Sequence, residues 1–365
     1  MTRKAEPHQN KDWSSFVDPC LQDLQDRIDE NQEQLNYDSW VAFLDDRCPD
    51  EIFIPPARQP SPPRCEWPEV TVNEALEDQT AMLLQQFKGC SDVLTRGGGS
   101  RLNVRCNYGI GILPSLFGCE IFLMDESTDT LPAAKPLAST EKIKALLDKG
   151  IPELTTGLGS KVFQMAQVFL GIFQKYPILR RHVHLYHPDL QGPIDVAEVV
   201  WGSDIFYAFH DQPDLVRDIL KLLTDTYIVF MRRWYDLVGQ PGLYSAHWGM
   251  LQKGAVMIRD DSLMNLSPQI YQDLVRPLDQ QIFRQFGRSG AIHFCGRGDH
   301  YIQLMSEIPG LTAVAMSQPK CNNMETIYCH TVDKNIKLIG FSLEHARKSN
   351  RPLRGQVQCF LPDKT

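Results

Sequence analysis

Residues 254–296 read GAVMIRDDSLMNLSPQIYQDLVRPLDQQIFRQFGRSGAIHFCG, and this stretch decides the fold. A short β-rich run, Ala255–Arg259, comes first. Ser267 and Pro268 then mark the start of a helix, because serine is a good N-cap and proline suits the first helical position. Glycines end that helix before a second β-rich run, Ala291–Cys295. The stretch predicts a strand, a helix and a second strand, and such a unit pairs its strands in parallel.

The same alternation continues on both sides of this unit. Other candidate strands are Arg101–Cys106, His182–Tyr186, Leu311–Met316, Ile336–Phe341 and Gln356–Phe360, and another helix opens at Asp211 with Pro213. Repeated alternation of this kind favours an α/β protein, a closed (β/α)8 TIM barrel over residues 71–365. An open doubly wound sheet is the alternative. Its dinucleotide fingerprint is incomplete here, because Gly109-Ile-Gly111-Ile-Leu-Pro114 has a proline in place of the third glycine.

Residues 1–70 are predicted to form a helical N-terminal extension that ends in a proline-rich connector. Its first half has apolar residues at helical spacing: Leu21, Leu24, Ile28 and Leu35. Six prolines between Pro55 and Pro68 exclude helix and central strand there. We expect the extension to be peripheral, with a further helix over Val72–Lys88 opening the main domain.

The composition excludes several classes of function. The 365 residues carry 45 acidic and 37 basic side chains, a net charge of −8, and no basic block interleaved with aromatics, so nucleic acid is not an expected partner. Apolar runs such as Tyr227–Met231 are far shorter than the ~20 residues of a membrane span. Neither a membrane nor an export signal is expected, and the ten cysteines are therefore interpreted as reduced thiols of a cytoplasmic protein.

His293 and Cys295 are the sharpest candidates for chemistry. Residues two apart in a strand point to the same face, so the imidazole and the thiol share one small volume. Gly296 follows at once, which places the pair at the carboxyl end of a strand, where barrel active sites form. Nitrogen and sulfur together suit zinc, but two ligands do not hold it. The alternative is a core histidine beside an inert buried thiol.

A third metal ligand has to come from elsewhere in the chain. Cys359 ends the candidate last strand, in phase with Val357, and is the first choice. Cys321 lies in the loop after Leu311–Met316 and is the second choice.

Five motifs occur in order: Gln191-Gly-Pro-Ile-Asp195, Asp211-Gln-Pro-Asp-Leu-Val216, Arg259-Asp-Asp-Ser262, Leu266-Ser-Pro268 with Val275-Arg-Pro277, and His293-Phe-Cys-Gly296. Through them, residues from about 95 to 360 resemble the uroporphyrinogen decarboxylase superfamily. Within it, a His-x-Cys pair and a late cysteine are similar to the zinc-dependent methyltransferases that move a methyl group from a methylated corrinoid protein to a thiol such as coenzyme M. That resemblance implies the ligands His293, Cys295 and Cys359. The segment Gln356–Pro362 departs from the pattern, since it lacks the glycines that usually surround the last cysteine.

The resemblance implies an enzyme, a methyltransferase with Zn²⁺ as cofactor, a corrinoid protein or free methylcobalamin-type corrinoid as methyl donor, and a small thiol as acceptor. Zinc with one imidazole and two thiolates keeps a fourth position open, where a thiol loses its proton near neutral pH. A decarboxylase-like carboxy-lyase acting on a tetrapyrrole is one alternative. A non-catalytic barrel that binds a corrinoid or tetrapyrrole is another. A homodimer is among the assemblies that the sequence allows.

Other candidate site residues come from elsewhere in the sequence. Asp260 and Asp261 follow the strand Ala255–Arg259 and could act as base, as partner of the metal-binding histidine or as a turn cap. His247 is a third catalytic candidate, with packing as its alternative role. Four residues are candidates for binding the cofactor or an anionic substrate: Gln191, Gly109, Gly111 and Arg297.

Overall fold

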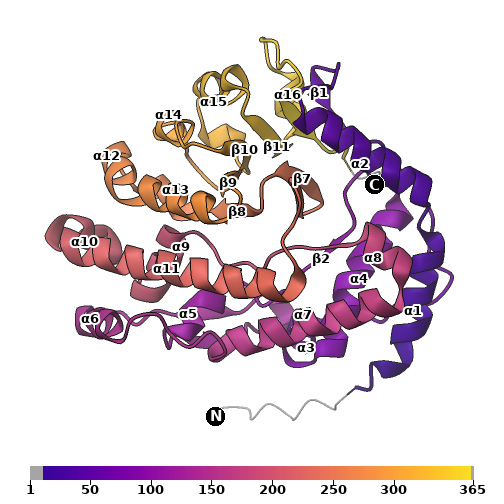
Figure 1. Ribbon diagram of the computed structural model, residues 1–365, viewed down its shortest axis with the longest axis horizontal. Helices are drawn as coiled ribbons and strands as arrows, with labels where there is room; N and C mark the ends of the chain where they lie inside the picture. The colour runs from indigo at the N-terminus through magenta and orange to yellow at the C-terminus, as the bar shows by residue number, and fades with distance from the viewer. Residues whose placement is uncertain (1–10, 363–365) are drawn as a thin grey trace.

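Short strands gather near the centre of the molecule and helices surround them (Figure 1). The structure is a computed structural model that describes residues 11–362. The strands are β1 (Ile52–Phe53), β2 (Asn103–Val104), β3 (Glu120–Phe122), β4 (Ala133–Lys135), β5 (His184–Leu185), β6 (Tyr244–His247), β7 (Met250–Lys253), β8 (Val256–Arg259), β9 (Gly290–Phe294), β10 (Leu311–Met316), β11 (Lys337–Phe341) and β12 (Val357–Cys359).

The α-helices are α1 (Ser14–Arg27), α2 (Glu30–Leu44), α3 (Val72–Glu77), α4 (Gln79–Arg96), α5 (Ile112–Leu116), α6 (Thr140–Lys149), α7 (Gly157–Lys175), α8 (Pro177–His182), α9 (Pro193–Trp201), α10 (Ile205–Asp211), α11 (Pro213–Val238), α12 (Pro268–Ile270), α13 (Arg276–Gln285), α14 (Ile302–Met305), α15 (Met324–His330) and α16 (Leu343–Arg347). Shorter turns are η1 (Glu126–Thr128), η2 (Asp261–Asn265), η3 (Tyr271–Val275), η4 (Pro319–Cys321) and η5 (Val332–Lys334).

Six strands form one parallel sheet in the order β1-β12-β11-β10-β9-β8. A separate parallel pair joins β2 to β5, and β3–β4 and β6–β7 are antiparallel hairpins. Helices connect the parallel strands of the large sheet, as the strand-helix alternation predicts. The α/β class is confirmed.

A closed eight-stranded barrel is not confirmed. Within residues 11–362 no strand ladder joins β1 to β2 or β5 to β8. At the second gap, Pro188 lies three residues after the end of β5 and has no N–H to donate to a ladder. The imidazole of His187 takes over part of that pairing, since its Nε2 accepts the N–H of Met257 on β8 at 3.1 Å.

Strand β9 shows how the two faces of the sheet are divided. All five of its residues are buried, as expected for a parallel strand covered on both sides. Ile292 and Phe294 pack in the large outer core between the sheet and the helices. Ala291 belongs to a second, inner core. His293 alternates with the outer-facing residues, so it lies on the inner side with Ala291, as its spacing predicts.

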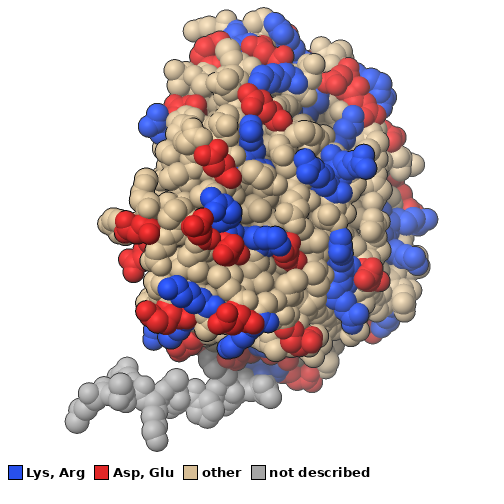
Figure 2. Space-filling view, turned by 60° about the vertical axis from the view of Figure 1, so that its left-hand side comes forward, with Lys and Arg blue, Asp and Glu red and all other residues tan. Residues whose placement is uncertain are grey.

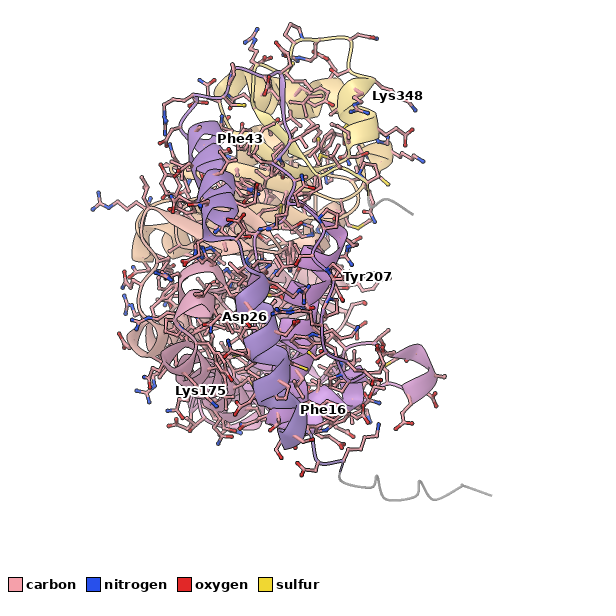
Figure 3. The ribbon with its side chains drawn as sticks, turned by 90° about the vertical axis from the view of Figure 1, so that its right-hand side faces the viewer. Phe16, Asp26, Phe43, Lys175, Tyr207 and Lys348 are labelled. Carbon is pink, nitrogen blue, oxygen red and sulfur yellow. The ribbon has the colours of Figure 1, made fainter. Side chains whose placement is uncertain are left out.

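The inner core is closed by α2, from the segment that we expected to be peripheral. Trp40 and Phe43 of α2 are fully buried against small residues of the sheet such as Ala291 and Ala313. Figure 3 shows α1 and α2 following one another along this side, with Phe43 labelled on α2. The peripheral expectation is therefore wrong. Helical spacing reveals an apolar face but not the surface that it covers.

The boundary predicted at residue 70 stays a prediction. Strand β1 lies before it in the chain, within the extension, and pairs in parallel with β12 of the main sheet. The proline-rich stretch from residue 55 to 68 contains neither helix nor strand, as its composition predicts.

The β6–β7 hairpin occupies the inner side of the sheet and was not predicted. Leu251 and Met250 pack in the inner core, and β7 contacts both β9 and β10. At the hairpin tip, Trp248 adopts a left-handed backbone conformation with φ 48°. Its ring lies 4.8 Å from that of His293, so the hairpin carries an aromatic side chain to the candidate site.

Two predicted helix starts are confirmed. Pro213 is the first residue of α11, and the Ser267 hydroxyl accepts the N–H of Ile270 at the start of α12. The turn η3 that follows is a π-turn, because Pro277 lacks the N–H that would continue a regular helix. Pro277 therefore explains why this helical stretch is divided into α12, η3 and α13.

No helix within residues 11–362 combines the length and apolar character needed to cross a bilayer. Acidic and basic side chains are interspersed over the face shown in Figure 2.

Candidate metal centre and adjoining cavities

Asp261, His293 and Cys295 form a compact group of potential metal ligands. One ligand atom from each lies within 4.8 Å of the others. The Sγ of Cys295 is 3.4 Å from Nε2 of His293, and that nitrogen is 3.5 Å from Oδ1 of Asp261. The structure brings the predicted pair together and adds a carboxylate that the sequence had suggested as a base, a partner of the metal-binding histidine or a turn cap.

Two neighbouring strands position this group. β8 and β9 pair in parallel with Arg259 opposite His293, so their carboxyl ends meet at one edge. Asp260 donates its backbone N–H to the carbonyl of His293 at 2.9 Å. One residue further, Oδ1 of Asp261 accepts the N–H of Cys295 at 2.7 Å. The carboxylate is thereby held over the end of the adjacent strand.

Two of the three separations in the group are close to those around a tetrahedral ion. Typical zinc bond lengths place a sulfur and a nitrogen ligand about 3.6 Å apart and a nitrogen and an oxygen ligand about 3.4 Å apart. The measured 3.4 and 3.5 Å are close to both values. A histidine nitrogen, a thiolate and a carboxylate oxygen are all ordinary zinc ligands. The donor types and these two separations therefore suit zinc, with a fourth position left for another ligand.

Burial acts on both of the predicted ligands. It lowers the pKa of His293, which favours the neutral imidazole that a metal needs. It raises the pKa of Cys295, and the Ser317 hydroxyl, 3.5 Å from the sulfur, partly opposes that shift. A thiolate at this position would therefore need a nearby cation to stabilise it.

Cys359, the first choice for the third ligand, is not part of the group. It is fully buried in the outer core with Val357, between the sheet and the helices. Burial raises the pKa of its thiol to about 12. Strand alternation placed Cys359 correctly in phase with Val357, but that face of β12 points to the helices rather than to the inner side. The structure gives no support for Cys359 as a ligand.

Cys321, the second choice, lies in η4 and is exposed. It is also outside the group. The signal for the third member was present in the sequence, because Asp261 follows the strand next to that of His293 and the carboxyl ends of parallel strands meet at one edge.

A cavity of about 370 Å³ opens beside the group and includes Asp261 and His293 in its wall. The rest of its lining is Ile110, Asp189, Gln191, Asp195, Glu198, Val199, Trp248, Arg259 and Ser262. A second cavity of about 280 Å³ lies on another side of His293 and Trp248, and its lining is mostly apolar: Met250, Ala315, Met316, Ser317, Ile339 and Gly340.

Arg259 is the positively charged residue in the wall of the larger cavity, and its guanidinium is already paired with a carboxylate. Its guanidinium donates to Asp189 and contacts Nε2 of His247 at 2.6 Å. It also lies 4.8 Å from the centre of the Trp248 ring. Arg105 approaches the same Asp189 carboxylate at 3.4 Å. The positive charge of Arg259 is therefore neutralised within the wall.

His247, predicted as catalytic, lies beneath this wall. It is fully buried, and burial followed by the charge of Arg259 lowers its pKa well below the ordinary value. It does not line either cavity beside the group. Its contact with Arg259 helps to position that guanidinium, and catalysis by His247 stays a prediction.

Asp260 is also separated from the cavities. Its carboxyl group is fully buried beside Asp279, and burial followed by that neighbour raises its pKa well above the ordinary value. Its Oδ1 lies against Gly192, where an added Cβ would be 1.8 Å away. Of the two adjacent aspartates, only Asp261 reaches the metal-ligand group.

Asp195 supports that group and was missed as a site residue. Its two oxygens accept the backbone N–H groups of Asp261, at 2.9 Å, and Ser262, at 2.7 Å. The hydroxyl of Ser262 in turn donates to Glu198 at 2.5 Å. Burial raises the pKa of Asp195 to about 7. The acidic residue in the first turn after Pro193 was the available signal, since such positions can bind nearby backbone N–H groups.

Of the four predicted cofactor-binding residues, only Gln191 lines the larger cavity. Gln191 lines the larger cavity with its backbone at φ 61° and donates to Asp189. Gly109 and Gly111 do not line it, although Ile110 between them does. Arg297 is exposed and pairs with Asp299 at 2.7 Å, outside both cavities. Cofactor binding by these residues stays a prediction.

Comparison with known proteins gives a match to a solved structure. No family model matches the chain, and no curated protein matches its sequence. Among solved structures, a methyltransferase from Methanosarcina mazei superposes with a TM-score of 0.61. The match covers 88% of this chain and 90% of that one at 14% sequence identity. The chain therefore shares its overall fold with that methyltransferase.

Proposed function

We propose that this protein is a metal-dependent methyltransferase that moves a methyl group from a methylated corrinoid to a thiol. The observation that carries the proposal is the group of Asp261, His293 and Cys295 at the carboxyl ends of β8 and β9, open to a cavity. The shared fold with a methyltransferase supports it. The resemblance of the motifs supplies the corrinoid donor and the closed (β/α)8 barrel, which both belong to this proposal.

Zinc is the ion that we assign to the group. His293 would bind through Nε2, Cys295 through Sγ and Asp261 through Oδ1, in place of the predicted set with Cys359. When bound, zinc would lower the pKa of a thiol in its fourth position, so that the thiolate nucleophile exists near neutral pH. A corrinoid protein or a free corrinoid would present its methyl group from the open side of the cavity.

The residues of this chain position the ligands. Asp195 holds the backbone of Asp261 and Ser262. The rings of Trp248 and His293 meet edge to face, with an interplanar angle of 85°, which restrains the imidazole. The Ser317 hydroxyl contacts the sulfur of Cys295. Partners of this kind fix the orientation of metal ligands and are important for metal affinity.

Metal analysis combined with a transfer assay tests the proposal. We expect purified protein to carry close to one zinc per chain and to demethylate added methylcobalamin in the presence of a thiol, followed by the spectral change of the corrinoid. Cys295→Ser should remove the zinc and the transfer while circular dichroism shows an intact fold. Full zinc occupancy in that variant, or zinc-loaded protein without transfer to any thiol, would contradict the proposal.

A further inference from the structure

The smaller cavity beside the candidate metal centre is an opening in the inner core of the sheet. Three of its lining residues, Met250, Ala315 and Ile339, belong to that core. The cavity has a volume of about 280 Å³, and voids larger than a water molecule are few in protein interiors. Apolar cavities exclude water but accept apolar molecules, and a cavity of about 150 Å³ is enough for benzene. This cavity therefore has room for a small apolar ligand.

The lining of this cavity offers no fixed charge to a ligand. Within the described part of the chain, the imidazole of His293 is its one ionisable group, and Ser317 carries its one hydroxyl. Burial lowers the pKa of His293, so the imidazole itself is favoured in its neutral form. A sulfonate, carboxylate or ammonium group in such a place loses its water without gaining an ionic partner, which is costly. The lining therefore selects against charged ligands.

The cavity adjoins two of the three potential metal ligands. His293, whose Nε2 belongs to the group, is part of its wall. Ser317 is another lining residue, and its hydroxyl lies 3.5 Å from the sulfur of Cys295. The larger cavity meets His293 and Trp248 from another side. A molecule bound to the metal can therefore extend into the smaller cavity while a second reactant approaches through the larger one.

An irregularity of β11 faces the same cavity. The pairing of β11 with β12 shifts register between Leu338 and Phe341. Gly340 lies in this interval, lines the cavity and has a left-handed backbone with φ 65°. Its N–H donates to the side chain of Gln358 at 2.7 Å, and an added Cβ would lie 2.8 Å from Sδ of Met250. A glycine within a strand often marks a bulge or a place where a ligand approaches the backbone closely. Gly340 thus keeps open the space beside Met250.

We propose that the methyl acceptor is an uncharged thiol with a small apolar body, which lies in this cavity while the sulfur takes the open metal position. The proposal rests on the proposed function in assigning the thiol to the metal. In the transfer, the sulfur forms a bond to the methyl carbon and the cobalt–carbon bond breaks, with its electron pair left on cobalt and the thiol proton released to solvent. Ala315, Ile339 and Gly340 are thus specificity-determining residues.

Binding measurements test this proposal without requiring methyl transfer. Zinc-loaded full-length protein is titrated by isothermal calorimetry with 1-butanethiol, 3-mercapto-1-propanol and 3-mercaptopropionate, which are primary thiols of similar length. We expect 1-butanethiol to bind at least about tenfold more tightly than the other two, because a buried hydroxyl or carboxylate loses its water without gaining a partner.

Ala315→Val narrows the cavity without changing a potential metal ligand. We expect it to weaken the binding of 1-butanethiol at least about tenfold, because a rigid cavity tolerates added methyl groups poorly. Competition with a chromophoric chelator should show wild-type zinc affinity in this variant. Ala133→Val on β4 is the matched control, since Ala133 is a half-buried strand residue that lines neither cavity beside the group. It should leave the binding of 1-butanethiol unchanged.

Equal or tighter binding of the alcohol or the carboxylate by the wild-type protein would overturn the proposal, whether or not Ala315→Val folds. Unchanged binding of 1-butanethiol in a folded Ala315→Val protein would do the same. Methyl transfer that prefers 3-mercaptopropionate would support the proposed function and overturn this choice of acceptor. Selective binding of 1-butanethiol without transfer from methylcobalamin would count against the proposed function and leave the cavity as a binding site for apolar thiols.

Discussion

Oδ1 of Asp261 accepts the backbone N–H of Cys295 at 2.7 Å, across 34 positions of sequence. This bond joins the end of β8 to the end of β9 and places a carboxylate beside the His293 imidazole and the Cys295 thiol. One aspartate thus ties two strand ends together and completes a set of three potential ligands.

Asp261→Ala is expected to abolish tight zinc binding. Removing a ligand should cost more than the 10–100-fold lost when a partner of a ligand is removed, so we expect a decrease of more than about 100-fold. Competition with a chromophoric chelator measures the affinity. Asp261→Asn, which keeps an oxygen but loses the charge, should fall between the alanine variant and the wild type.

Cys359→Ala and Cys321→Ala serve as controls for that experiment. Both should keep wild-type zinc affinity, because neither thiol lies in the group. Cys359→Ala should instead lower the free energy of unfolding by about 1–2 kcal/mol, since it removes a buried atom from the outer core. Zinc loss in Cys359→Ala with retention in Asp261→Ala would show that the sequence-based ligand set was right.

The local elements of the fold could be predicted from sequence because their signals are local. Leu311–Met316 was predicted with the observed bounds of β10, and the Ser267 cap was found because serine before proline is a local pattern. The positions of α2 and of the β6–β7 hairpin could not be predicted. Both depend on packing between distant segments, where small residues such as Ala291 and Ala313 leave room for Trp40.

In the candidate site, too, local relationships could be predicted from the sequence and relationships between distant segments could not. His293 and Cys295 share a strand, and strand alternation suffices to bring them together. To identify the third potential ligand, one has to know which strand lies next to β9 and which face of β12 points to the inner side of the sheet. Alternation gives the phase of Cys359 with Val357, but contacts with the helix layer decide that both point outward. For this reason the sequence named Asp261 as a candidate but did not place it among the metal ligands.

Trp40→Ala should destabilise the protein strongly. Trp40 is fully buried in the inner core, with its ring 5.2 Å from that of Phe53 on β1. Loss of a buried tryptophan costs about 3–5 kcal/mol through lost burial and the cavity left behind. Urea denaturation measures the change. Leu35→Ala on the same helix is the control, because Leu35 is 54% exposed and should change stability by less than about 0.5 kcal/mol. Similar effects of the two variants would show that α2 is peripheral after all.

Asp279→Asn should change how stability depends on pH. Burial, the first cause, raises the pKa of Asp279 well above its ordinary value. The unfolded chain releases this proton at lower pH than the folded protein, so the stabilising contribution is complete below the ordinary aspartate range and is lost as pH rises toward the folded pKa. Each proton that differs between the two states changes stability by about 1.4 kcal/mol per pH unit.

Asparagine does not titrate, and it can still pair with the carboxyl group of Asp260. Asp279→Asn should therefore gain stability relative to the wild type between pH 5 and pH 8, by more than about 1 kcal/mol. Urea denaturation at the two pH values in the presence of a chelator checks this. Asp218→Asn, an exposed site on α11, should show no such gain. An equal difference from the wild type at both pH values would mean that Asp279 carries no raised pKa.

Gly192→Ala should disturb both the fold and the metal centre. A Cβ at this position would lie 1.8 Å from Oδ1 of Asp260 and 2.8 Å from the carbonyl oxygen of Arg259, so the loop and the end of β8 cannot both stay in place. Asp261 directly follows Asp260 in the chain, so the position of its carboxylate depends on the same end of β8. We expect a loss of more than about 2 kcal/mol in stability, from overpacking at a rigid site, together with at least tenfold weaker zinc binding.

Gly171→Ala on α7 is the matched control, because nothing lies within 4 Å of its added Cβ and alanine favours helix by up to about 1 kcal/mol. Thermal denaturation and chelator competition on the two variants separate the outcomes. A Gly192→Ala protein with wild-type stability and zinc affinity would show that the close contact between the loop before α9 and the end of β8 does not position the metal ligands.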